Sequence, residues 1–137
     1  MQKIPTMLTV VAAALQNPKG QFLLQKRPEG RAMAGLWEFP GGKIDGDETP
    51  EQALVRELSE ELAIHVDSEN LAPACFASAP LGDRQLLLLL YICRIWEGIP
   101  TAVESPALGW FEISEMRELA MPPADEPLLD LLERLIV

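Results

Sequence analysis

Runs of apolar residues and their spacing predict six strands and three helices. Apolar, β-branched and aromatic runs predict strands at residues 8–15, 22–26, 37–39, 74–78, 86–94 and 108–113. The leucine-rich run at 86–94 favours a central strand that is covered on both faces. A turn at 17–20 makes residues 22–26 the returning strand of a hairpin with 8–15.

Helical spacing predicts helices at residues 50–62, 114–119 and 126–135. The first helix has the clearest start, because Thr49 is a favoured N-cap, Pro50 suits the first helical position and Gln52 completes a capping box. Its apolar side, which includes Leu58 and Leu62, is the face expected to pack on a core. Strands interspersed with helices indicate an α/β fold.

The other side of this first helix is acidic. Glu57, Glu60 and Glu61 are spaced i, i+3 and i+4, which places their carboxylates within an arc of roughly 100°. Like charges at these spacings cost a few tenths of a kcal/mol per pair in an isolated helix. A hard divalent cation, which prefers oxygen ligands, would offset that cost. The alternative is a solvated acidic face without a ligand.

Composition narrows the class of protein. A chain of 137 residues predicts a single domain, residues 1–137. The net charge of −10 argues against a duplex nucleic-acid surface, and the longest apolar run, 86–92, is too short to cross a bilayer. No cleavable leader is evident, and two cysteines without metal or disulfide spacing favour a cytoplasmic protein with reduced thiols. We therefore expect no nucleic-acid or membrane partner, whereas the charge does not argue against a small-molecule phosphate substrate if metal ions screen the carboxylates. We expect a monomer, with a weak dimer as the alternative.

The segment 41–64, GGKIDGDETPEQALVRELSEELAI, resembles the Nudix box, GX5EX7REUXEEXGU with U a bulky aliphatic residue. The matching positions are Gly42, Glu48, Arg56, Glu57, Leu58, Glu60, Glu61 and Ile64. Ala63 stands where the family has glycine, at the end of the helix, where a left-handed residue often closes it. This departure concerns the cap geometry and removes no metal ligand.

The resemblance implies a Nudix fold, with a mixed β-sheet sandwiched between helices, and a loop–helix–loop that holds Mg²⁺ against a substrate pyrophosphate, with Mn²⁺ as a substitute. The implied ligands are the Gly41 carbonyl and the carboxylates of Glu57, Glu60 and Glu61, joined by Glu104 from a distant loop. Glu57 would also activate the attacking water, while Arg56 orients the carboxylates and Glu48 braces the loop. The alternatives are an ordinary surface ion pair for Arg56 and Glu48, and a solvated loop charge for Glu104.

Segments outside the box, at 25–28, 37–43, 96–98 and 122–127, are similar to those of MutT-type enzymes. That resemblance implies hydrolysis of 8-oxo-dGTP to the monophosphate and pyrophosphate, which keeps an oxidised base out of the DNA precursors and prevents mutation. One alternative is a MutT-like hydrolase of CTP or 5-methyl-dCTP. Another, of a different class, is a Nudix domain that binds nucleotides without hydrolysing them.

Five residues are substrate-binding candidates. Arg27 aligns with an arginine that contacts substrate phosphates in the family, and Lys43 and Arg84 are weaker phosphate candidates or solvated side chains. Phe39 either borders the base or belongs to the core. Asp125 is the base-recognition candidate, because an ionised carboxylate accepts hydrogen bonds and guanine offers two adjacent donors, N1–H and the exocyclic amine. Its alternative role is to cap the last helix.

Overall fold

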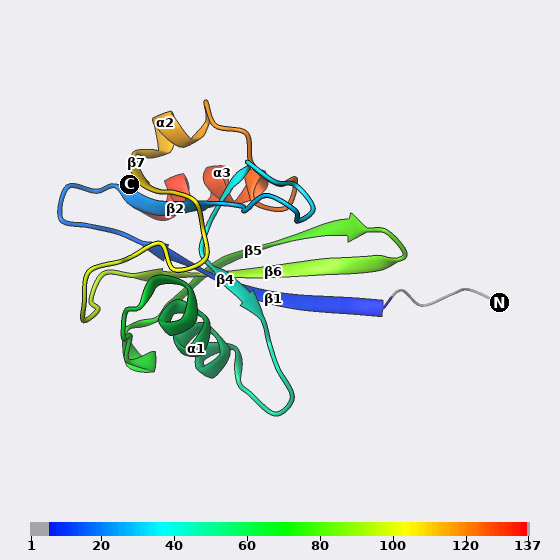
Figure 1. Ribbon diagram of the computed structural model, residues 1–137, viewed down its shortest axis with the longest axis horizontal. Helices are drawn as coiled ribbons and strands as arrows, with labels where there is room; N and C mark the ends of the chain where they lie inside the picture. The colour runs from blue at the N-terminus through cyan, green and yellow to red at the C-terminus, as the bar shows by residue number, and fades with distance from the viewer. Residues whose placement is uncertain (1–5, 137) are drawn as a thin grey trace.

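The structure is a computed structural model that describes residues 6–136. The elements in chain order are β1 Thr6–Leu15, β2 Phe22–Lys26, β3 Trp37–Glu38, β4 Gly41–Lys43, α1 Pro50–Leu62, the 3₁₀-helix η1 Ser68–Asn70, β5 Ala72–Leu81, β6 Arg84–Cys93, β7 Leu108–Phe111, α2 Ile113–Met116 and α3 Glu126–Ile136. They form the layered arrangement that the resemblance implies, in which α1 lies on one side of a four-stranded sheet and α3 on the other (Figure 1).

The four-stranded sheet is mixed and has the order β4-β1-β6-β5. β1 runs parallel to β6 over its whole length, while the β1–β4 and β5–β6 pairs are antiparallel. A second sheet, β3-β2-β7, is antiparallel. The predicted hairpin between residues 8–15 and 22–26 is therefore wrong beyond its base, where a single bridge joins Gln16 to Phe22.

Two hydrophobic cores explain why β2 leaves β1. The side chains of Phe22 and Leu24 are buried in the core under α3, whereas Leu23 is buried in the core under α1. A strand that buries alternate residues in both cores must lie between them rather than extend the edge of one sheet. β1 and β6 show the same alternation, because their even and odd positions face different cores.

The predicted and observed boundaries coincide at β2 and at α1. Thr49 and Gln52 form the expected capping box, and the helix covers residues 50–62 as predicted. Ala63 closes the helix in the left-handed conformation, at φ 56° and ψ 36°, so an alanine takes the backbone geometry of the family's glycine. β4 and η1 were not predicted, β5 and β6 extend beyond the predicted ranges, and α2 is shorter than predicted.

The helices cover only part of the four-stranded sheet. The ends of β1, β5 and β6 near the β5–β6 hairpin project beyond α1 and α3 (Figure 1). In the described part of the chain, no helix has the length and apolar character needed to cross a membrane. The projecting strands leave an open floor on which a site can be built.

Candidate active site

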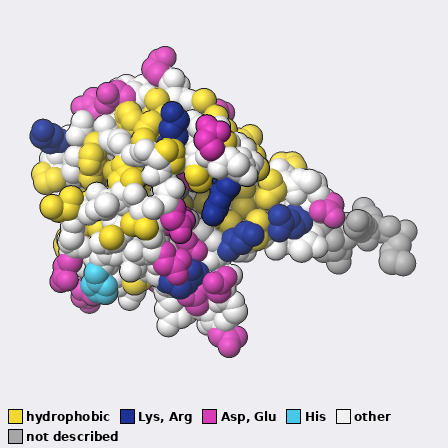
Figure 2. Space-filling model, in the orientation of Figure 1, with side chains coloured by type: hydrophobic (Ala, Val, Ile, Leu, Met, Phe, Trp, Pro, Cys, Tyr) yellow, Lys and Arg dark blue, Asp and Glu magenta, His cyan; other side chains and the backbone are white. Residues whose placement is uncertain are grey.

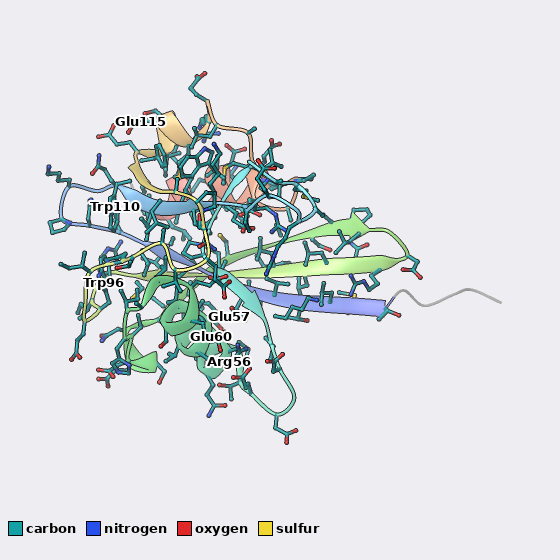
Figure 3. The ribbon with its side chains drawn as sticks, viewed as in Figure 1. Arg56, Glu57, Glu60, Trp96, Trp110 and Glu115 are labelled. Atoms are coloured by element: carbon teal, nitrogen blue, oxygen red, sulfur yellow. The ribbon has the colours of Figure 1, made fainter. Side chains whose placement is uncertain are left out.

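The acidic side of α1 faces the loop that follows β4, where Arg56, Glu57 and Glu60 lie together (Figure 3). Arg56 grips Glu48 with two bonds, from Nε to Oε2 at 2.8 Å and from Nη2 to Oε1 at 3.0 Å. Its Nη1 donates to Glu57 Oε1 at 3.0 Å and lies 3.3 Å from Glu60 Oε2, and its Nη2 donates to the Lys43 carbonyl at 3.1 Å. One guanidinium therefore fixes the loop to the helix and orients the Glu57 carboxylate.

The contacts between Arg56 and Glu48 shift the pKa values of both groups, each in the direction that favours its charged form. The hydrogen bonds from Arg56 hold the pKa of Glu48 below its usual value, and the bonds to Glu48 and Glu57 raise the pKa of Arg56 above its already high value. Arg56 thus stays charged at every accessible pH.

Glu57 and Glu61 are the two box glutamates that reach a cavity. Burial raises the pKa of Glu57, against the opposing hydrogen bond and charge of Arg56. Burial and the nearby charge of Glu57 raise the pKa of Glu61 to about 8. The Glu61 carboxylate accepts the Gly41 N–H at 3.0 Å, and the Gln25 side chain also hydrogen-bonds to it.

Gly42 lies directly against the Glu57 carboxylate. A Cβ at position 42 would lie 2.4 Å from Glu57 Cδ and 2.5 Å from its Oε1, closer than real Cβ atoms approach other atoms. Glycine at this position lets the carboxylate lie directly on the backbone of β4.

The cavity has a volume of about 710 Å³, and most of the predicted site residues line it. Its floor is apolar, with Val10, Leu86 and Leu88 from the projecting strands, and acidic and basic side chains surround it (Figure 2). The predicted site residues in its lining are Arg27, Phe39, Gly41, Lys43, Glu57, Glu61, Arg84, Glu104 and Asp125. Of these residues, Lys43 and Arg84 are exposed.

Glu60 and Arg56 do not line the cavity. The Glu60 side chain is 55% exposed and pairs with Arg56. Among residues 6–136, no three His, Cys, Asp or Glu side chains are grouped closely enough to form a metal site. Glu57, Glu61 and Glu104 nevertheless line the cavity together, and their carboxylate oxygens could act as metal ligands. Oxygen ligands of this kind fit a hard divalent cation.

Glu104 reaches the cavity on a loop that is anchored on both sides. The Val103 N–H donates to the Glu61 carbonyl at 3.2 Å, so the loop satisfies one of the carbonyls at the end of α1. The Ser105 hydroxyl donates to the Lys26 carbonyl at 2.6 Å and accepts the Lys26 N–H at 3.1 Å. Glu104 is therefore held between α1 and β2.

Asp125 also lines the cavity and is buried, with 6% of its surface exposed. Its Oδ2 accepts the Phe39 N–H at 3.2 Å, a bond to β3's end rather than to the start of α3. Burial and the charge of Glu38 raise the pKa of Asp125 to about 7, against the opposing effects of the Phe39 N–H and Arg27. The Phe39 side chain is 3% exposed and belongs to the core under α3.

Glu38 and Gln25 are site residues to which the sequence analysis assigned no role. Glu38 accepts a bond from Arg27 Nη1 at 2.8 Å, and burial raises its pKa. Gln25 is 6% exposed and is paired with Glu38 across the β2–β3 ladder. The available signal was a polar residue within each of two apolar strands, since buried polar groups need a partner.

Comparisons with known proteins cover nearly the whole chain. The sequence model of the NUDIX domain matches residues 5–132. An 8-oxo-dGTP diphosphatase of Escherichia coli is 34% identical over 93% of this chain and 98% of its own length. A CTP pyrophosphohydrolase of the same organism is 38% identical over 90% of each chain. The solution structure of the E. coli ORF135 protein has a TM-score of 0.86 at 36% identity, and the match covers 97% of this chain and 93% of that one.

Proposed function

The chain belongs to the Nudix family of hydrolases, and from this premise we propose that it hydrolyses a nucleoside triphosphate to the monophosphate and pyrophosphate, with 8-oxo-dGTP as its preferred substrate. The observation that carries the proposal is that one cavity is lined both by the carboxylates of Glu57, Glu61 and Glu104 and by the buried carboxyl of Asp125. The three glutamates could hold a metal ion that binds the substrate phosphates, and the Asp125 carboxyl could form hydrogen bonds with a base.

Nudix hydrolases use divalent metal ions, and we propose Mg²⁺, with Mn²⁺ as a substitute. Glu57, Glu61, Glu104 and the Gly41 carbonyl would hold it, with Glu60 joining if its bond to Arg56 is released. When bound, the ion supplies positive charge that neutralises the phosphates and acidifies a water molecule.

The protein's own residues would then act as follows. Glu57 accepts the proton of the attacking water, and its raised pKa makes it a stronger base than an exposed glutamate. Arg56 holds that carboxylate in place through its bond at 3.0 Å. Water adds to one of the two phosphorus atoms that flank the α–β bridge, and that P–O–P bond breaks. The bridging oxygen stays on the other phosphorus, so that the monophosphate and pyrophosphate are released.

Cationic side chains on the cavity wall would bind the phosphates. Lys43 and Arg84 are exposed and can reorient towards them. Arg27 Nε and Nη1 already donate to Ala32 and Glu38, so Nη2 is the nitrogen that would meet a phosphate oxygen.

CTP or 5-methyl-dCTP is the second candidate substrate class. Asp125, with a pKa of about 7, is partly protonated at neutral pH. A protonated carboxyl donates one hydrogen bond and accepts another, which matches N3 and the exocyclic amine of cytosine. The similarity to a CTP pyrophosphohydrolase supports the same alternative.

A substrate panel tests the proposal. We expect Mg²⁺-dependent pyrophosphate release, with the highest kcat/KM for 8-oxo-dGTP among 8-oxo-dGTP, dGTP, CTP and 5-methyl-dCTP. A higher kcat/KM for the two cytosine nucleotides would select the alternative. No release from any of the four, with nucleotide binding retained, would indicate a binding domain.

We also propose that the protein works as a monomer in the cytoplasm. Cys75 and Cys93 are both free thiols, as suits a reducing compartment.

A further inference from the structure

The loop between β2 and β3, residues 27–36, contains a backbone conformation that its side chains disfavour. Met33 has a φ of 60°, in the left-handed region that any residue with a Cβ avoids. The same loop has glycine at its two other left-handed positions, Gly30 and Gly35. Glycine would adopt this conformation at position 33 without strain. The chain nevertheless has a methionine there, a residue whose side chain makes the conformation unfavourable.

The hydrogen bonds of the loop do not involve the Met33 side chain. Arg27 Nε donates to the Ala32 carbonyl at 2.8 Å, the Gly35 N–H donates to the Arg27 carbonyl at 3.0 Å, and the Leu36 N–H donates to the Met33 carbonyl at 3.2 Å. Nor is the side chain packed in a core, since Met33 is 40% exposed. Packing in the free protein therefore does not offset the strain at this residue.

The Met33 side chain lies instead on the wall of the cavity. Together with Ala32 it lines the side of the cavity formed by the loop, whereas Leu86 and Leu88 belong to the strand floor. In Figure 1 the loop lies above the projecting ends of β1, β5 and β6. The bond from Arg27 to Glu38, the residue before Phe39, ties the loop to the end of the cavity that holds Asp125.

A flat aromatic base whose edge meets Asp125 would have the leucine floor on one face and the loop on the other. A thioether is polarisable and makes favourable contacts with aromatic rings. Residues in strained backbone conformations cluster at functional sites. Here the contact that offsets the strain would form only when a nucleotide is bound.

We propose that Met33 is a substrate-contacting residue, held in the left-handed conformation so that its side chain covers the face of the nucleobase opposite the strand floor. The inference rests on the proposed function, because it requires that a nucleotide occupies the cavity.

Met33→Gly tests the inference cleanly, because glycine removes the side chain and also accepts the backbone conformation without strain. We expect KM for 8-oxo-dGTP and Kd for 8-oxo-dGMP, measured by calorimetry, to rise roughly tenfold, which is the usual loss for an apolar contact of this size. We expect kcat to stay unchanged, because a contact to the base is made equally by the substrate and the transition state, and Tm to stay equal or rise. Met33→Leu should restore Kd to within about twofold, since it restores the apolar volume.

Ala63→Gly is the matched control. Ala63 is also a left-handed residue that is not glycine, but it lies at the exposed end of α1 and does not line the cavity. The Ala63→Gly variant should have a higher Tm, because glycine relieves the strain, and unchanged KM and Kd.

Two results would overturn the inference while leaving the proposed function intact. In one, Met33→Gly leaves Kd unchanged, so that the side chain has no part in binding. In the other, it lowers Tm, so that Met33 holds the loop for a structural reason. If the wild-type protein bound neither 8-oxo-dGMP nor CMP, the proposed function itself would fail, and the inference with it.

Discussion

Raising the pH from 6 to 8.5 should shift the preference of the enzyme from cytosine towards guanine nucleotides, because Asp125 titrates in this range. Its carboxyl is buried and has a pKa of about 7, raised by burial and by the charge of Glu38 and opposed by Arg27 and the Phe39 N–H. Oδ2 accepts that N–H at 3.2 Å, so Oδ1 is the oxygen that takes up the proton. Below pH 7 the carboxyl presents a donor and an acceptor, and above it presents acceptors alone.

The two states fit different bases. Cytosine offers one acceptor, N3, beside one donor, so it requires the protonated form. Guanine can pair with the ionised form through N1–H and its amine, and with the protonated form through O6 and N1–H. With a pKa of about 7, the protonated fraction is about 0.9 at pH 6 and about 0.03 at pH 8.5. The ratio of kcat/KM for CTP to that for dGTP should therefore fall at least roughly 30-fold.

The measurement is a competition between the two substrates in one reaction, with both monophosphates quantified. The general base, the metal ligands and the phosphate contacts act on both substrates, so their titrations cancel in the ratio. Asp125→Asn is the control, because its amide keeps one donor and one acceptor at every pH, and its ratio should be flat. A wild-type ratio that changes less than about threefold, or an asparagine variant with the same slope, would refute the reasoning.

Three further predictions concern catalysis and stability. Glu57→Gln should lower kcat at least roughly 100-fold at saturating Mg²⁺, and near-wild-type pyrophosphate release would remove its role as the base. Gly42→Ala should lower kcat without unfolding the protein, since the new Cβ would lie 2.4 Å from Glu57 Cδ; unchanged kcat, with the fold checked by circular dichroism, would show that the carboxylate can move. In scanning calorimetry without metal, Tm should fall between pH 5 and pH 8.5, because folded Asp125 and Glu61, with pKa values of about 7 and about 8, keep protons that the unfolded chain has lost. The stabilisation is complete below their unfolded values of 3.8 and 4.5, and a Tm that rises over this range would contradict the assignment.

The sequence predicted the elements whose signals are local. α1 was placed at its observed ends because Thr49 and Pro50 mark its start through contacts within one turn. β4 was missed because Gly41 and Gly42 have little strand preference, and they form a strand only by pairing with Val11 and Ala12 of β1. The destination of β2 depends on two cores made by distant segments, which no local pattern encodes.

The same division applies to the site. The box spacing predicted which carboxylates lie on one side of α1, and Glu57 and Glu61 do line the cavity. The spacing could not predict that Glu60 would be exposed and paired with Arg56. That pairing depends on where the guanidinium lies when it is bonded to Glu48. The pairing of Arg27 with Glu38 joins two strands, and so it became visible only once the ladder was formed.

The four-stranded sheet separates the two hydrophobic cores, and it also separates the helices that supply different parts of the site. Glu57 and Glu61 come from the helix on one face, Asp125 directly precedes the helix on the other, and all three line the cavity. If Asp125 recognises the base as proposed, substitutions around α3 can alter the base preference while the packing of α1 stays unchanged. A fold with this layout can diversify its substrates through few changes on one face, which is consistent with the similar identity of this chain to relatives named for an oxidised purine and for a pyrimidine.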